Sequence, residues 1–104
     1  MIEFKGSLIE QFVLQELKIN KDLLINYWGN NNGNAKIDFV IQKNKFIIPI
    51  EVKVTINLQA KSLKVYNEIF KPKIAIRTSL ADYKQTSILY DVPLYTIGNF
   101  IEKV

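Results

Sequence analysis

The sequence contains no cysteine and no histidine, and Arg77 is its single arginine. Without cysteine the chain has neither a disulfide framework nor a thiolate metal site. Without histidine, Ser–His and Cys–His nucleophilic schemes and imidazole metal ligands are excluded. Aspartate, glutamate, lysine and tyrosine remain as the groups that can transfer protons or bind metal ions.

Long apolar runs are also missing from the sequence. No segment approaches the roughly 18–20 uninterrupted apolar residues of a membrane span, and the N-terminus lacks the basic and then apolar layout of a secretory signal. We therefore expect a cytoplasmic protein with no membrane segment. With 104 residues, 48% of them hydrophobic, the chain is expected to form one domain with a packed core over residues 1–104.

The charge balance is mildly basic, with 14 Lys and Arg against 10 Asp and Glu and a net charge of +4. This bias is compatible with a polyanionic partner such as DNA. Because almost every basic residue is a lysine, bidentate reading of guanine by arginine is not expected. Any contact with nucleic acid should be made mostly to phosphates and depend little on sequence.

Hydrophobic periodicity and turn residues predict an alternation of helices and strands. This order is typical of an α/β sandwich with a mixed central sheet flanked by helices. The prediction comprises a helix over 5–18, strands over 23–28, 37–41 and 47–53, a helix over 60–70, a strand over 73–77, a short strand over 88–90, an apolar run over 93–97 and a terminal helix from 99.

Charged residues interrupt two of these apolar strands. Asp38 lies within the strand 37–41, and Glu51 and Lys53 lie within the strand 47–53. Side chains alternate between the two faces of a strand, so Glu51 and Lys53 should share one face of the sheet. An uncompensated charge in a buried strand costs several kcal/mol, so each carboxylate needs a partner.

A short polar connection, residues 42–46, joins these two strands and predicts a β-hairpin. If Asn44 and Lys45 form a two-residue turn, Asp38 stands opposite Glu51. Facing carboxylates favour a cation between them, and carboxylate oxygens suit Mg²⁺ or Mn²⁺. The alternative is that Asp38 ends a strand at the surface while Glu51 forms a solvated pair with Lys53.

The first helix offers two further carboxylates. Glu10 falls at the border of the apolar stripe of the helix 5–18, and Glu16 lies between the directions of two apolar residues of the same stripe. Either carboxylate could face the sheet half-buried, and the alternative for each is a solvated glutamate. We expect Glu10, more than Glu16, to turn toward Asp38 and Glu51.

These residues resemble the core of the PD-(D/E)XK, or restriction-endonuclease-like, nucleases. A closer resemblance, over nearly the whole chain, is to the C-terminal domain of unknown function in a family of prokaryotic AAA-type ATPases. The segments that carry it are Lys5–Val13, Asn26–Trp28, Ile37–Ile41, Ile48–Lys53, Ala60–Lys64 and Pro72–Ser79. None of the four glycines lies in a phosphate-binding loop. The chain is therefore expected to be the nuclease-like domain without the ATPase module.

The resemblance implies a restriction-endonuclease-like fold and a metal-dependent phosphodiesterase site. It implies that Asp38 and Glu51 bind Mg²⁺ or Mn²⁺, that Glu10 assists, and that Lys53 orients the attacking water. The sequence departs from the pattern in two ways. The proline that precedes the aspartate in the family motif is missing, and Lys36 and Ile37 stand there. Lys36 also occupies a position where related sequences often have an acidic residue.

Two functions remain open at this point. The first is a DNA nuclease in which Lys36, Lys61 and Lys64 contact phosphates beside the site. The second is a catalytically inactive module of the same fold that docks DNA, a protein partner such as an ATPase module, or another copy of itself.

Overall fold

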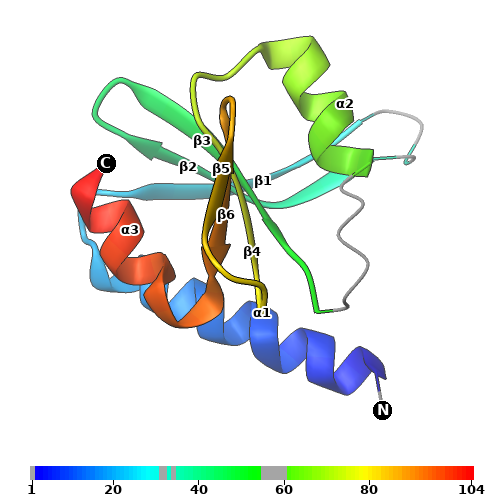
Figure 1. The fold of residues 1–104 in the computed structure, drawn as a ribbon, viewed down its shortest axis with the longest axis vertical. Coiled ribbons are helices and arrows are strands. Elements are labelled where there is room, and N and C mark those ends of the chain that lie inside the picture. The colour runs from blue at the N-terminus through cyan, green and yellow to red at the C-terminus, as the bar shows by residue number, and fades with distance from the viewer. Residues whose placement is uncertain (1, 31–32, 34, 55–60) are drawn as a thin grey trace.

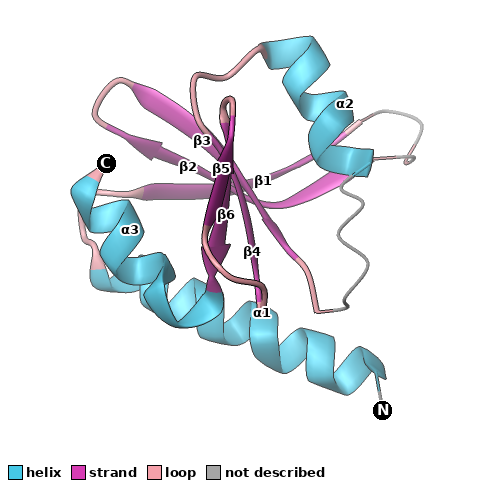
Figure 2. Cartoon of the chain, viewed as in Figure 1, coloured by secondary structure: helices cyan, strands magenta, loops and turns pink. Residues whose placement is uncertain are grey.

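The structure is a computed structural model that describes residues 2–30, 33, 35–54 and 61–104, with the backbone alone for residues 2–7. Helices and strands alternate along it as shown in Figures 1 and 2. In chain order the elements are α1 (Ile2–Ile19), β1 (Leu24–Gly29), β2 (Lys36–Lys43), β3 (Phe46–Val52), α2 (Lys61–Phe70), β4 (Ala75–Ser79), β5 (Lys84–Thr86), β6 (Leu89–Pro93), the 3₁₀ helix η1 (Leu94–Thr96) and α3 (Ile97–Lys103).

The six strands form one mixed sheet in the order β1-β2-β3-β4-β6-β5. Strand β2 is antiparallel to both β1 and β3, and β5 is antiparallel to β6. Strand β4 lies between β3 and β6 and runs parallel to both. A parallel neighbour requires a crossover connection, and α2 lies in the connection from β3 to β4.

The helices cover the two faces of the sheet unequally. Helices α1 and α3 pack against one face, and α2 packs against the other, above the sheet in Figure 1. The larger core cluster lies between the sheet and α1 and α3, and its buried members are Val13, Leu17, Ile41, Ile48, Ile50, Val52, Ile76, Val92, Leu94, Ile97 and Ile101. The smaller cluster lies under α2 and comprises Ile37, Leu63, Tyr66 and Ala75.

The predicted α/β class and mixed sheet are confirmed, and most predicted elements are present within two residues of their ends. The apolar residues of the two main helices are less buried than their periodicity suggests. Leu8 and Phe12 of α1 are 54% and 40% exposed, and Ile69 and Phe70 of α2 are 57% and 52% exposed. The apolar stripe of each helix is therefore wider than the surface that the sheet covers.

The last third of the chain departs further from the sequence-based expectation. Strand β5 was not predicted, because its three exposed residues are polar and carry no apolar alternation. The apolar run 93–97 is not a strand, since β6 ends at Pro93 and η1 and α3 follow directly. The segment 55–60, which follows the predicted strand 47–53 and includes the first residue of the predicted helix 60–70, lies outside the described residues.

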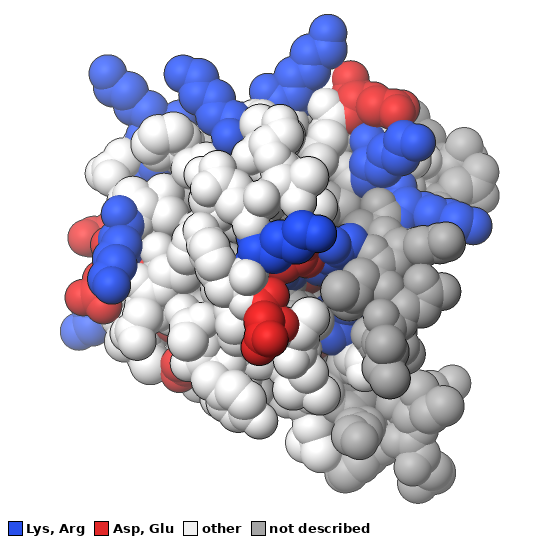
Figure 3. Space-filling model, in the orientation of Figure 1, with Lys and Arg blue, Asp and Glu red and all other residues white. Residues whose placement is uncertain are grey.

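Charge is unevenly distributed over the surface. Figure 3 shows basic side chains projecting from the top of the view, over the β2–β3 hairpin and α2, with few acidic side chains among them. Within the part of the chain that the structure describes, no helix has the length and apolar character needed to cross a membrane.

Candidate functional site

The hairpin of β2 and β3 sets the position of the candidate site. Lys43 pairs with Phe46, so Asn44 and Lys45 form the predicted two-residue turn, and Asn44 has a positive φ of 55°. Left-handed backbone at this position is tolerated by asparagine better than by most residues. The register then runs without a slip past Pro49, which pairs with Val40. The pairing of β3 with β4 starts only after Pro49, so no ladder bond to β4 is lost there.

A β-bulge in β2 changes the direction of Asp38. Between the pairs Asn26–Val40 and Trp28–Ile37, β2 contains one residue more than β1, and this extra residue falls in the segment that holds Asp38. The pairing of β2 with β3 correspondingly ends at Phe39 and Ile50, one step before Asp38 would face Glu51. A bulge re-aims side chains, and the carboxylate of Asp38 here turns toward the backbone of β3.

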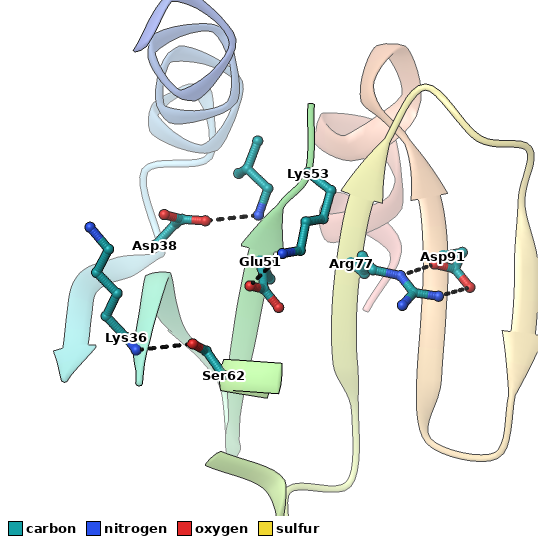
Figure 4. A network of polar contacts seen from close by, with 8 residues as sticks. Lys36, Asp38, Glu51, Lys53, Ser62, Arg77 and Asp91 are labelled. Carbon is teal, nitrogen blue, oxygen red and sulfur yellow. Dashed lines mark hydrogen bonds and ion pairs between the residues drawn. The ribbon is translucent and has the colours of Figure 1, made fainter. Parts of the chain in front are cut away.

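Asp38 is half-buried and accepts a hydrogen bond from the backbone N–H of Val52 at 2.9 Å through Oδ2. Figure 4 shows this bond, which fixes the carboxylate at the end of β3. A charged acceptor strengthens such a bond. The bond compensates part of the cost of burying Asp38.

Glu51 lies one residue earlier on β3 and on the face that α2 covers. It is 7% exposed, and its Oε1 lies 3.4 Å from the amine of Lys53, as the alternation of the strand predicts. Its Oε2 is buried and has no hydrogen-bond partner among the described residues. Burial raises the pKa of Glu51, the amine of Lys53 lowers it, and the nearby carboxylate of Asp38 raises it further.

Glu10 approaches the site from α1. Loss of surrounding water raises the pKa of Glu10, and the adjacent carboxyl of Asp38 raises it further by its charge and by a hydrogen bond, while Lys36 opposes the shift. Its side chain remains exposed at the surface. Glu16 instead lies against Gly98 of α3, where the side chain comes close to the helix backbone. Of the two glutamates considered, Glu10 is the one beside Asp38.

The three acidic side chains form a chain of neighbours with Asp38 in the middle. Asp38 shifts the pKa of both Glu10 and Glu51. Nevertheless, no group of three Asp or Glu side chains within the described ranges is arranged so that it could hold a metal ion together. A metal ion here would have to be held by fewer than three of these carboxylates.

A buried ion pair continues this row of charges across the sheet. Glu51 pairs in register with Arg77 on β4, and Arg77 pairs with Asp91 on β6. The guanidinium of Arg77 binds Asp91 in a bidentate manner, with Nε donating to Oδ1 and Nη2 donating to Oδ2 at 3.0 Å. The positive charge of Arg77 also lowers the pKa of Glu51.

Sequence reasoning did not include Arg77 or Asp91 in the site. The signal was present for Asp91, because it interrupts an apolar strand, Leu89–Pro93, just as Glu51 interrupts its own strand. What was missing was the parallel register of β3, β4 and β6, which depends on pairing between strands far apart in the sequence.

The remaining predicted residues are lysines at the margin of this row. The backbone N–H of Lys36 donates to Ser62 Oγ of α2 at 3.2 Å, and this bond ties the start of β2 to α2 (Figure 4). Lys61 and Lys64 are exposed on α2. Lys64 lines a shallow surface hollow together with Arg77.

A profile for a family described as a domain of unknown function, DUF4143, matches residues 5–97. The chain belongs to the DUF4143 family. In this DUF4143 domain the match runs from α1 to the first residue of α3 and includes every candidate site residue. A search of curated proteins and a search of solved structures returned no match.

Proposed function

We propose that this DUF4143 domain is a nuclease of restriction-endonuclease-like ancestry that hydrolyses phosphodiester bonds in DNA with Mg²⁺ or Mn²⁺. The order of elements supports the proposal: a helix with Glu10, a strand with Asp38, a strand with Glu51 and Lys53, and then a helix and a parallel strand. This is the order expected from the resemblance to PD-(D/E)XK nucleases.

One observation carries the proposal. Glu51 Oε2 is buried and has no hydrogen-bond partner in the described part of the chain, although a buried carboxylate oxygen without a partner costs stability. Proteins keep such groups where another ligand satisfies them. A hard divalent cation suits this oxygen and the neighbouring Asp38.

Each side chain of the site has a distinct role in the proposed reaction. Asp38 and Glu51 would hold the metal ion, which supplies Lewis-acid catalysis and lowers the pKa of a water molecule. Lys53 is half-buried beside Glu51, and its amine would neutralise negative charge that develops on the phosphodiester oxygens. Glu10, next to Asp38, would accept a proton from the attacking water.

A nuclease assay tests the proposal directly. Labelled single-stranded DNA, double-stranded DNA and RNA are incubated with the protein and Mn²⁺, and the variants Asp38→Ala and Lys53→Ala are measured beside it. We expect cleavage of DNA to fall at least about a hundredfold in both variants, because metal ligands and charge-stabilising groups each contribute at that level. The exposed Asp82, outside the site, provides the matched control variant Asp82→Ala.

A second candidate function is a catalytically inactive module that docks DNA or a protein partner. It is favoured by the finding that no three carboxylates of the described residues could hold a metal ion together. Calorimetric titration with Mn²⁺ separates the two candidates. A chain that binds no Mn²⁺ and cleaves no substrate is the inactive module, whereas Mn²⁺ binding that is lost in Asp38→Ala supports the nuclease.

A further inference from the structure

An apolar groove lies at the end of the molecule beyond the candidate site. It has a volume of about 550 Å³ and lies between the turn of the β2–β3 hairpin and the C-terminal end of α2. Ile47 of β3 and Phe70 of α2 line it, and although both are large apolar residues they are 53% and 52% exposed. Exposed apolar surface gathered in a concave site is typical of an interaction site.

Aromatic packing makes one wall of the groove rigid. The ring of Phe70 lies 4.6 Å from the ring of Tyr66 and 5.9 Å from that of Trp28, and it meets the indole of Trp28 edge to face. Tyr66 and Trp28 therefore pack against Phe70 and restrict the motion of its ring, while part of the ring stays exposed. A pre-ordered apolar wall loses little conformational entropy when a partner binds.

Lysines form the charged margin of the groove. Lys45 lies at the hairpin turn, Lys71 and Lys73 follow α2, and none of the described residues that line the groove is acidic. Figure 3 shows basic side chains projecting over this end of the molecule. Positive charge around an apolar centre selects a partner with the opposite sign of charge.

The backbone of Lys71 adds a further observation. Lys71 has a positive φ of 49°, and its N–H donates to the carbonyl oxygen of Asn67 at 2.9 Å, which closes the C-terminus of α2. Glycine is the residue that adopts this conformation without strain. A lysine here strains the backbone and places a positive charge at the margin of the groove.

We propose that this groove binds an acidic segment of a partner protein that inserts apolar side chains between Ile47 and Phe70. The apolar centre and the lysine margin together fit such a segment. Single-stranded nucleic acid fits less well, because base stacking requires exposed aromatic faces, and among the described residues that line the groove Phe70 is the one exposed aromatic residue. This binding does not depend on metal ions or on catalysis.

Titration of the ¹⁵N-labelled protein with synthetic peptides tests the proposal. The probe is a short peptide with Leu and Phe at helical spacing and Glu and Asp elsewhere. Two comparison peptides replace either its acidic residues by Lys or its apolar residues by Ser. We expect only the first peptide, which carries both acidic and apolar residues, to bind, with chemical-shift changes confined to residues 44–47 and 70–73.

Two variants separate binding from folding. Ile47→Asp should weaken binding of the acidic peptide at least about tenfold, because it places a charge in the apolar centre. Lys71→Gly should weaken binding about threefold while the melting temperature stays equal or rises, since glycine relieves the positive φ. Ile19→Asp is the matched control, because Ile19 is also apolar and exposed, at 73%, but lies at the end of α1.

Four results would overturn the proposal. The first is equal binding of the lysine peptide, and the second is an equal loss of binding in Ile19→Asp. The third is tighter binding of a labelled single-stranded oligothymidylate to the same residues, which would assign the groove to nucleic acid. Absence of shift changes at residues 44–47 and 70–73 with the acidic peptide would likewise reject the site.

Discussion

Glu51 combines burial, a raised pKa and an oxygen that has no hydrogen-bond partner among the described residues. Burial raises the pKa of Glu51 above its ordinary value near 4.5, although the amine of Lys53 opposes the shift. The folded state therefore binds a proton at Glu51 more tightly than the unfolded state does. Stability contributed in this way is present at acidic pH and is lost as the pH rises from about 4.5 through the pKa of the folded state.

This linkage leads to a prediction for Glu51→Gln. The variant removes a buried negative charge, so in the absence of metal ions we expect its free energy of unfolding at neutral pH to exceed that of the wild type by about 1 kcal/mol. We also expect the fall in stability above pH 4.5 to be smaller in the variant. Urea denaturation at several pH values measures both effects.

Glu16→Gln provides the control for this experiment, because Glu16 is half-buried against α3 and outside the site. The interpretation of Glu51 is rejected if Glu51→Gln is less stable than the wild type at neutral pH. Addition of Mn²⁺ should reverse the order, since a bound cation stabilises the charged carboxylate of the wild type alone.

Individual residues of the site could be predicted from the sequence for a simple reason. Charges that interrupt apolar strands are rare, and the alternation of strand side chains fixes which of them share a face. The ion pair of Glu51 and Lys53 follows from that alternation, as does the burial of Ile48, Ile50 and Val52 on the opposite face. The metal-binding roles of Asp38 and Glu51 stay predictions.

At the scale of elements, the bulge in β2 is the unpredicted feature that bears most directly on the site. The hairpin turn correctly predicted the register of β2 with β3, because a two-residue turn fixes the pairing on both sides. The bulge arises instead from the pairing of β2 with β1. It depends on contacts between residues that no local pattern links, and it gives Asp38 its bond to the backbone of Val52.

The ion pair of Arg77 and Asp91 joins the parallel strands β4 and β6, and it provides a prediction about stability. Both side chains are largely buried, with exposed fractions of 13% and 7%. Asp91→Ala leaves a buried guanidinium without its bidentate partner, so we expect a loss of about 3–5 kcal/mol in the free energy of unfolding. Urea denaturation monitored by the fluorescence of Trp28 measures this loss.

The double variant Arg77→Met with Asp91→Leu shows whether the ion pair stabilises the fold through its charges or through the packing of its side chains. Replacement of both charges by apolar side chains removes the desolvation cost together with the attraction, so most of the stability should return. If the double variant is as unstable as Asp91→Ala, the pair contributes through shape rather than charge. Asp82→Ala, on the exposed loop before β5, should change stability by less than about 0.5 kcal/mol.

At the scale of the whole molecule, two surfaces with different properties lie toward the two ends of β3. The acidic side chains of Glu10, Asp38 and Glu51 lie where β2, β3 and α1 meet. The groove lined by Ile47 and Phe70 lies instead at the hairpin end of β3. Ile47 and Glu51 both belong to β3 and lie four residues apart along it. A substrate at the first surface and a protein segment at the second could therefore be bound together.

The net charge of +4 and the dominance of lysine lead to a prediction about DNA binding by the whole domain. Lys36 and Lys53 lie beside the candidate site, and Lys61 and Lys64 are exposed on α2. A lysine ammonium contacts phosphate as a point charge without the planar fork that reads bases. Neutralisation of about three or four phosphates gives a slope of roughly −3 to −4 when log K is plotted against log salt on duplex DNA. Two unrelated duplexes should bind with nearly the same affinity.

Fluorescence anisotropy with labelled duplexes over a series of salt concentrations measures the slope. Lys64→Ala should reduce the magnitude of the slope by about 1, whereas the control Lys103→Ala, at the end of α3, should leave the slope unchanged. Tight binding to one duplex at high salt would show that recognition depends on bases, and absence of binding at low salt would favour the protein-docking module over the nuclease.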